Sequence, residues 1–190
     1  MMPHLLIFGF GYSAARIAGW ARAAGWTVGG TSRDGRPGTV RFDAAGPEIA
    51  RATHILSSVP PDDGTDPVLE AYGAALAGHG GWLGYLSSTG VYGDSDGAWV
   101  DEGAPIGGGR RGARAEADAR WLALGARVFR LPGIYGPGRS ALDTVRSGRA
   151  HRVDKPGQVF SRIHVEDIAT VLQASMARPA PGTVYNVADD

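Results

Sequence analysis

Short apolar runs alternate with stretches of helical periodicity along this sequence. The apolar runs predict strands at residues 4–9, 26–31, 39–43, 53–59, 82–87, 126–131 and 183–187. Apolar positions recurring every three or four residues predict helices at 13–24, 66–77, 110–124 and 164–177. Strands that alternate with helices indicate a parallel sheet covered on both faces. We therefore predict a doubly wound α/β fold with strand order 3-2-1-4-5-6, in which the fourth strand lies beside the first.

Composition narrows the class of protein further. The 190 residues fit one domain, and no repeat or linker divides residues 1–190. Nineteen basic residues balance nineteen acidic ones, so no net field draws the protein to nucleic acid or to an anionic membrane. No apolar run is long enough to span a bilayer, and the N-terminus lacks the basic region of a signal peptide. With no cysteine and no metal-ligand spacing among the five histidines, we expect a cytoplasmic protein without a metal site.

A glycine-rich turn follows the first predicted strand. Gly9, Gly11 and Ala14 form a G-x-G-x-x-A motif, with Tyr12 and Ser13 between the last two. In this context the first glycine permits a tight turn, and the second lets the backbone approach a pyrophosphate. Free N–H groups at the start of the following helix would face the phosphates. The motif predicts a Rossmann domain that binds a dinucleotide.

Ser32 and Arg33 follow the second predicted strand, about 20 residues past the glycines. An arginine at this point accommodates the 2′-phosphate of NADP, whereas an acidic residue holds the ribose hydroxyl of NAD. Arg33 therefore favours NADP as the cofactor. Asp34, one position later, leaves NAD open.

Four segments resemble the extended short-chain dehydrogenase/reductases of the NAD(P)-dependent epimerase/dehydratase family. Residues 84–93 (GYLSSTGVYG) resemble its SS…VYG segment, and residues 129–138 (FRLPGIYGPG) its R…IYGPG segment. Residues 160–169 (FSRIHVEDIA) and 184–187 (VYNV) are similar to two later family segments. The resemblance runs from Leu5 to Asn186, with the four segments in family order.

The resemblance implies roles for individual residues. Ser88 matches the catalytic Ser/Thr, whose hydroxyl would hydrogen-bond the reacting substrate oxygen. Tyr92 would lie near the nicotinamide, where it either donates a proton or serves substrate contact and packing. Arg162 matches a position that contacts a substrate's diphosphate. The other matched positions would contact the cofactor: Asp43 near the adenine, Ser57, Ser58 and Val59 beside the phosphates and ribose, and Pro132 and Gly133 beside the nicotinamide.

The sequence departs from the family at its acid/base pair, Tyr-x-x-x-Lys. If Glu116 is the family's glutamate, Gly108 and Gly112 occupy the tyrosine and lysine positions. Lys155 is the only lysine, and it does not stand four residues after any tyrosine. Near the lost pair lie Arg110, Arg111 and Arg114, which either bind an anionic substrate or form a solvated helix start.

Three functional hypotheses remain open. The first is an NAD(P)-dependent oxidoreductase or epimerase with an altered acid/base, acting on a hydroxyl or carbonyl substrate such as a nucleotide sugar. The second is a non-catalytic NADP(H)-binding sensor, and the third an interaction protein that kept only the fold. Family members continue into a C-terminal substrate lobe, so we expect that lobe to be missing or truncated here. A homodimer is left open.

Overall fold

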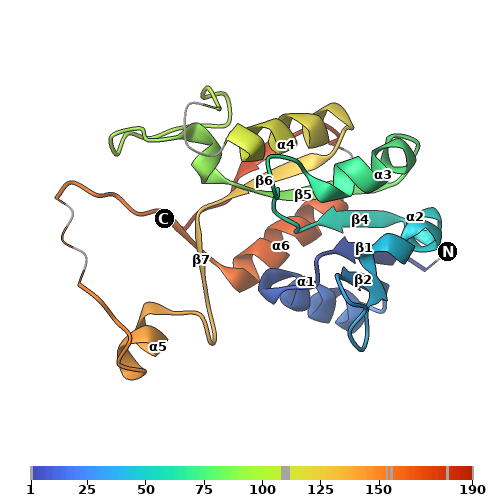
Figure 1. Ribbon diagram of the computed structural model, residues 1–190, viewed down its shortest axis with the longest axis horizontal. Coiled ribbons are helices and arrows are strands. Elements are labelled where there is room, and N and C mark those ends of the chain that lie inside the picture. Colours follow the sequence, from blue (N-terminus) through green and yellow to red (C-terminus); the bar gives the residue numbers. More distant parts are fainter. Residues whose placement is uncertain (1, 108–111, 153, 155, 179, 190) are drawn as a thin grey trace.

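The computed structural model describes all residues except 1, 108–111, 153, 155, 179 and 190. Within the described residues, seven strands form one parallel sheet with helices on both faces (Figure 1). The strands are β1 (His4–Phe8), β2 (Thr27–Ser32), β3 (Val40–Arg41), β4 (His54–Ser57), β5 (Trp82–Ser88), β6 (Arg127–Leu131) and β9 (Val184–Asn186). The α-helices are α1 (Tyr12–Ala23), α2 (Gly46–Arg51), α3 (Pro67–Ala77), α4 (Gly112–Ala123), α5 (Ala141–Arg146) and α6 (Val165–Met176).

The strand order is β3-β2-β1-β4-β5-β6-β9, which confirms the predicted order and adds the last strand outside β6. β4 lies beside β1, with Leu6 opposite Ile55 in the parallel register. β1 is buried along almost its whole length because helices cover both faces of the sheet. The fold is therefore the doubly wound Rossmann fold that the sequence predicts.

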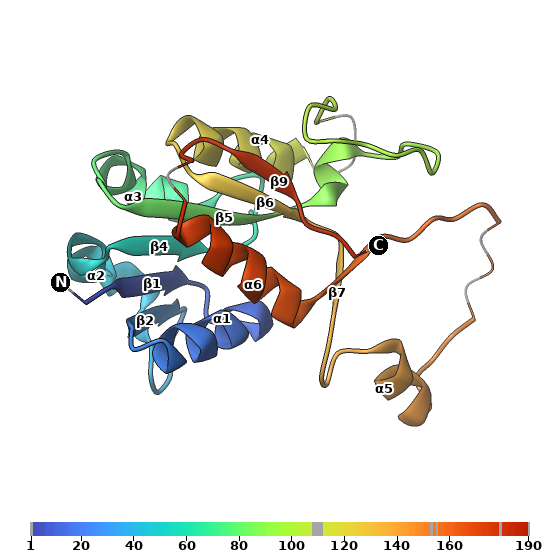
Figure 2. The ribbon, with the colours of Figure 1, turned by 180° about the vertical axis from the view of Figure 1, so that it is seen from behind.

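Two apolar clusters, one on each face, hold the helices to the sheet. Helices α1 and α6 lie side by side on one face of the sheet (Figure 2), and Ile17 and Leu172 are fully buried there. Leu76 of α3 and Trp121 of α4 are fully buried on the other. Each fully buried large side chain stabilises the fold by about 1.5–3 kcal/mol relative to an exposed one. None of the helices in the described part of the chain is both long and apolar enough to cross a membrane.

The hydrophobic pattern of the sequence did not predict several short elements. α2 and α5 each have six residues, and α5 buries none of them, so it carries no apolar stripe. Figure 1 shows α5 apart from the main sheet, on a long excursion between β7 (Gly133–Tyr135) and β8 (Arg162–His164). β7 and β8 pair in parallel as a second, two-stranded sheet. The predicted helix from 110 is described only from Gly112, because residues 110 and 111 lie outside the described residues.

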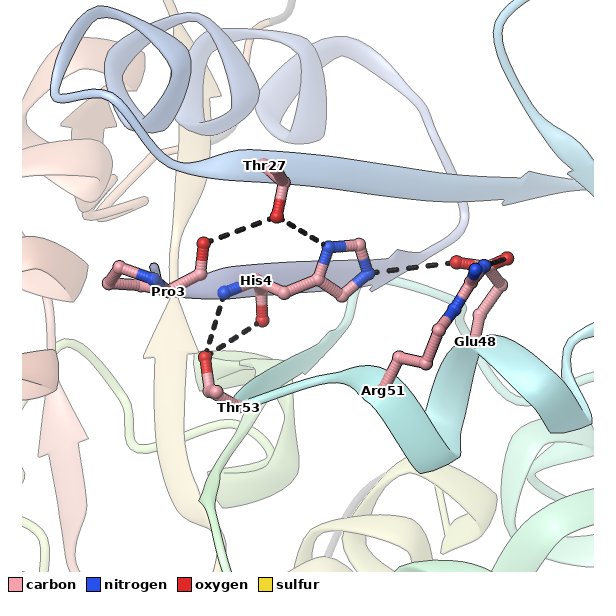
Figure 3. A network of polar contacts seen from close by, with 6 residues as sticks. All are labelled: Pro3, His4, Thr27, Glu48, Arg51 and Thr53. Atoms are coloured by element: carbon pink, nitrogen blue, oxygen red, sulfur yellow. Dashed lines mark hydrogen bonds and ion pairs between the residues drawn. The ribbon is translucent and has the colours of Figure 1, made fainter. Parts of the chain in front are cut away.

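A polar network fastens the amino-terminal edge of the sheet (Figure 3). The His4 ring contacts the Thr27 hydroxyl through Nδ1 at 2.8 Å and faces Glu48 Oε2 through Nε2 at 3.6 Å. Glu48 also pairs with Arg51 one turn later on α2. The backbone N–H of His4 donates to the Thr53 hydroxyl at 2.8 Å. These contacts tie β1 to β2, to α2 and to the start of β4, at the edge opposite the glycine-rich turn.

Candidate functional site

The carboxyl ends of four neighbouring strands bring the predicted site residues to one edge of the sheet. β1 ends at Phe8, just before the glycine-rich turn, and β4 ends at Ser57. β5 ends at Ser88, and β6 ends at Leu131, just before Pro132. In open α/β sheets, ligands bind in the crevice outside these strand ends. The residues predicted from separate parts of the sequence thus share one edge.

Gly9 makes the turn between β1 and α1. Its φ of +78° lies in the left-handed region, which favours glycine. A Cβ at this position would come within 2.9 Å of the Val59 side chain, so the turn also packs tightly on the segment after β4. The Gly9 N–H donates to the Thr31 hydroxyl at 3.2 Å, which fastens the turn to β2. Gly9 therefore fixes the path of the chain into α1.

The N-terminus of α1 is left open by the residues around it. Gly11 is the N-cap residue, no side chain of the described residues caps the helix, and its first turn carries no acidic residue. A Cβ on Gly11 would meet no described atom within 4 Å. Ser13 and Ala14 are buried against the sheet, whereas Tyr12 points its hydroxyl to the Pro137 carbonyl at 3.1 Å. Unpaired N–H groups at such a helix start favour an anion.

Ser57 and Ser58 line the same edge at the end of β4. Ser57 is fully buried, and its hydroxyl has no hydrogen-bond partner among the described residues. Buried hydroxyls are usually hydrogen-bonded. The Ser57 hydroxyl is therefore a candidate to bond a ligand. The Ser58 hydroxyl donates to the Gly9 carbonyl at 2.5 Å, which ties β4 to the glycine-rich turn. Val59, which follows, packs against Gly9.

The loop after β2 carries the residues predicted to choose between cofactors. The Ser32 hydroxyl contacts the Thr39 hydroxyl at 2.7 Å and accepts from the Arg36 N–H at 3.0 Å, which closes the loop. The Arg36 guanidinium donates to the Phe10 carbonyl in the glycine-rich turn. Arg33 and Asp34 directly follow β2, and both are exposed. Arg33 is therefore accessible to a phosphate beside the end of β2.

Asp43 lies in the short 3-10 helix Phe42–Ala44, directly after β3. Its carboxylate accepts two hydrogen bonds from Arg41, at 3.0 and 2.7 Å. The hydrogen bond from Arg41 holds the pKa of Asp43 below its usual value of 3.8. Asp43 is thus an ionised residue at the outer end of the strand edge, with its charge already paired.

Ser88 and Tyr92, the two predicted catalytic residues, stand at the two ends of one short segment. Ser88 precedes the 3-10 helix Thr89–Tyr92, and Tyr92 is its last residue. Ser88 caps this helix by accepting the Gly90 N–H at 3.1 Å. The Tyr92 hydroxyl donates to Asn186 Oδ1 at 2.6 Å and accepts from Arg130 Nη1 at 2.8 Å. The Arg130 guanidinium carbon also lies 5.0 Å from the centre of the Tyr92 ring. These contacts fit the packing role for Tyr92 that the sequence left open beside proton donation.

A buried ion pair forms the centre of this polar network. Asp118 of α4 is fully buried, and its carboxylate accepts from Arg130 Nε at 3.1 Å and Nη2 at 2.9 Å. It also accepts from the Ser87 hydroxyl at 2.7 Å. Burial lowers the pKa of Arg130, but the hydrogen bonds to Asp118 and Tyr92 outweigh it, so the net shift is upward. Arg130 Nη1 also donates to the Glu102 carbonyl at 3.2 Å, which fixes the loop after Tyr92.

The segment after β6 places the other predicted contacts. Pro132 follows the strand, and Gly133 begins β7, where its N–H donates to the Ser161 carbonyl at 3.2 Å. Arg162, opposite Gly133 in the register, is exposed and lies over the Phe160 ring at 5.5 Å. The structure therefore brings Arg162 beside Gly133.

Arg114 is the described member of the arginine group near the lost Tyr-x-x-x-Lys pair, since Arg110 and Arg111 lie outside the described residues. It donates to the Tyr85 hydroxyl at 3.1 Å and approaches the Leu86 carbonyl at 3.4 Å. Burial raises the pKa of Tyr85 to about 12, so this phenol stays protonated at neutral pH. Arg114 thus packs on β5.

Sequence reasoning assigned no role to three features of this edge. Thr31 holds the glycine-rich turn, and the residue carries no motif of its own. Arg36 closes the loop after β2 onto that turn. A signal for the Arg130–Asp118 pair was available, because Arg130 is a charged residue flanked by the apolar Phe129 and Leu131 in β6.

The fold and the glycine-rich edge together define a Rossmann domain of the dinucleotide-binding type. No family model matches the chain, and neither does any curated protein. Solved structures do match. At 47% identity and a TM-score of 0.90, the whole chain is similar to 73% of a conserved protein of unknown function from Silicibacter pomeroyi. At 26% identity and a TM-score of 0.79, it is similar to 77% of a Methylobacillus flagellatus structure assigned to the NAD-dependent epimerase/dehydratases.

A more distant match bears on the fold alone. It is the human epimerase family protein SDR39U1, solved with NADPH. The similarity covers 97% of this chain and 74% of that one, at 18% identity and a TM-score of 0.76. The chain belongs to the same family as the Silicibacter pomeroyi protein, and the Methylobacillus flagellatus structure places it among the NAD-dependent epimerase/dehydratases.

Proposed function

We propose that this chain binds NADP(H) at the carboxyl edge of β1, β2 and β4, and that it acts as an oxidoreductase or epimerase on a hydroxyl or carbonyl substrate. The observation that carries the proposal is the uncapped start of α1, with open space at Gly11. At the end of the neighbouring strand β4, the buried Ser57 hydroxyl has no partner among the described residues. Structures of family relatives with NADPH and with NAD support a nicotinamide dinucleotide as the ligand. Arg33 supports NADP over NAD.

The residues present fit this cofactor. The first-turn N–H groups of α1 and the helix dipole would hold the pyrophosphate. The fully buried Ser57 hydroxyl, unpaired among the described residues, would gain a partner. Exposed Arg33 would pair with the 2′-phosphate, and Asp43 would lie toward the adenine. Pro132 and Gly133 would border the nicotinamide, and Arg162 would hold an anionic group of the substrate.

The chemistry at the substrate would rest on Ser88. Bound NADP(H) supplies hydride transfer to or from a carbon centre. The Ser88 hydroxyl, at the end of β5, would hydrogen-bond the reacting oxygen and hold it beside the nicotinamide. Tyr92 stands four residues on and is the proposed proton donor, and this role requires its phenol to leave Asn186. Because the Tyr-x-x-x-Lys pair is absent, we expect turnover to be slower by about 10²–10⁴ than with a positioned acid/base.

A cofactor titration tests the proposal. NADPH should bind about 10- to 150-fold more tightly than NADH, since a charge-assisted contact contributes about 1.5–3 kcal/mol. Arg33→Asp should remove or reverse that preference. Arg178→Asp, the same change at an exposed site on the opposite edge, should leave it intact. Equal affinities for both cofactors in the unaltered chain would contradict the assignment of NADP.

Gly11→Val tests the location of the site. A side chain at Gly11 meets no described atom within 4 Å, and its φ of −92° suits any residue, so the fold should tolerate it. The valine would occupy the space of the pyrophosphate, and binding of both cofactors should be lost while circular dichroism stays unchanged. Undiminished binding by the folded variant would place the cofactor elsewhere.

A second function, an NADP(H) sensor without turnover, is favoured by the contacts of Tyr92. Its hydroxyl lies between Arg130 and Asn186, which makes it part of the buried network. Tight NADP(H) binding without turnover across a panel of carbonyl and nucleotide-sugar substrates would favour the sensor. If the Tyr92→Phe substitution lowers turnover, the result would favour the enzyme over the sensor.

A further inference from the structure

The turn between β7 and α5 is fastened to the start of α1. Gly136 and Arg139 close it by exchanging two backbone hydrogen bonds, at 3.1 and 2.9 Å. The Tyr12 hydroxyl donates to the Pro137 carbonyl at 3.1 Å, although the two residues are 125 positions apart. A Cβ on Gly136 would come within 2.6 Å of that hydroxyl and 2.7 Å of the Val165 side chain. The 136–139 turn is therefore seated closely on the first residue of α1.

Because the 136–139 turn packs against Tyr12, the Arg139 side chain lies beside the glycine-rich turn. Its guanidinium carbon lies 5.5 Å from the centre of the Tyr12 ring, a cation–π contact. Arg139 is exposed, and no carboxylate of the described residues pairs with it. By contrast, Arg16 of α1 forms an ion pair with Glu166, and Arg130 forms one with Asp118. Arg139 thus brings an uncompensated positive charge to the uncapped start of α1.

We propose that Arg139 is a second ligand for the cofactor's diphosphate, held over the start of α1 by the Tyr12 ring. The inference rests on the proposed function and adds a residue that the glycine motif does not contain. A guanidinium offers several N–H donors in a fixed fork that suits phosphate oxygens. The open space at Gly11 and the Ser57 hydroxyl, which lacks a partner within the described part of the chain, mark the same edge for a ligand.

The diphosphate assignment makes Arg139 differ from Arg33 in a measurable way. The diphosphate is common to NADPH, NADH and ADP-ribose, whereas the 2′-phosphate belongs to NADPH alone. Loss of Arg139 should therefore weaken all three ligands by a similar factor. Loss of Arg33 should weaken NADPH alone.

The test is a titration of NADPH, NADH and ADP-ribose against the unaltered chain, Arg139→Gln and Arg149→Gln. Arg149 is the matched control, because it is an exposed arginine on the same excursion whose guanidinium contacts only Ser147 among the described residues. Arg139→Gln should raise Kd about 10- to 150-fold for each ligand, the effect of losing one charge-assisted hydrogen bond. It should also flatten the dependence of NADH binding on salt. Arg149→Gln should change neither.

Three outcomes would overturn the inference. Unchanged Kd for all three ligands in Arg139→Gln would show that the residue does not contact the cofactor. A loss confined to NADPH would assign Arg139 to the 2′-phosphate. Failure of the unaltered chain to bind any of the three would overturn the proposed function as well, whereas the first two outcomes would leave that function standing.

Discussion

Replacing Arg130 by methionine should destabilise the fold far more than replacing a surface arginine. The substitution keeps much of the apolar stem but removes the guanidinium from Asp118, which is fully buried. Among the described residues, the Ser87 hydroxyl is then the one donor left to that carboxylate. Breaking a buried ion pair on one side costs about 3–5 kcal/mol, because an uncompensated charge stays in the interior. For a domain of this length the expected fall in Tm is about 6–20 °C.

Arg120 offers a matched control on the same helix as Asp118. Its guanidinium lies 2.7 Å from Glu70, closer than the 2.9 Å between Arg130 and Asp118. The side chains of the surface pair are 40% and 53% exposed, against 4% and 0% for the buried pair. Exposed pairs contribute about 0–1 kcal/mol, so Arg120→Met should cost no more than that.

Urea unfolding followed by circular dichroism would measure both free energies. The double substitution Arg130→Met with Asp118→Leu removes both charges and should recover at least half of the loss. Equal costs for Arg130→Met and Arg120→Met would refute the reasoning, because distance and not burial would then set the strength of the pair.

Two further predictions concern turnover and pH. Ser88→Ala should lower turnover by about 10²–10³, which is the effect of removing one donor to a reacting oxygen. The Kd for NADPH should stay unchanged. Unchanged turnover would contradict the role of Ser88. Burial, then the neighbouring His79 and Arg127, hold the pKa of His54 below its ordinary value of 6.5. The unfolded chain therefore takes up this proton first, and stability should fall as the pH drops below about 6.5. His54→Gln should flatten that part of a Tm–pH profile; an unchanged slope would assign the effect to other groups.

The architecture was readable from the sequence because parallel strands covered on both faces appear as continuous apolar runs. β1 shows this directly, since Leu5, Leu6, Ile7 and Phe8 are all apolar and buried. The glycine-rich turn was equally readable, because the tight path at Gly9 leaves few alternatives to glycine. Strand order followed from the doubly wound pattern, and the predicted neighbours β1 and β4 are confirmed.

The side-chain network at the site was not readable in the same way. Tyr92 meets Asn186 across 94 positions, and this contact depends on β9 joining the sheet outside β6. The position of Arg139 depends on how the 136–139 turn packs against α1. The sequence of residues 136–158 has no periodicity that predicts this packing. The short β7–β8 pair is likewise a product of tertiary packing.

The outer position of β9 also sets the order in which the site can be assembled. Asn186 supplies the acceptor for Tyr92, and its backbone N–H bonds Glu102 at 2.7 Å, so the last strand closes contacts made by the middle of the chain. During synthesis, the sheet from β3 to β6 can form before residue 186 has left the ribosome. The nascent chain would then hold its glycine-rich turn in place while the edge beside Arg130 and Tyr92 is still incomplete. The polar edge around Arg130 and Tyr92 would thus be completed after the turn that the proposed function assigns to the dinucleotide.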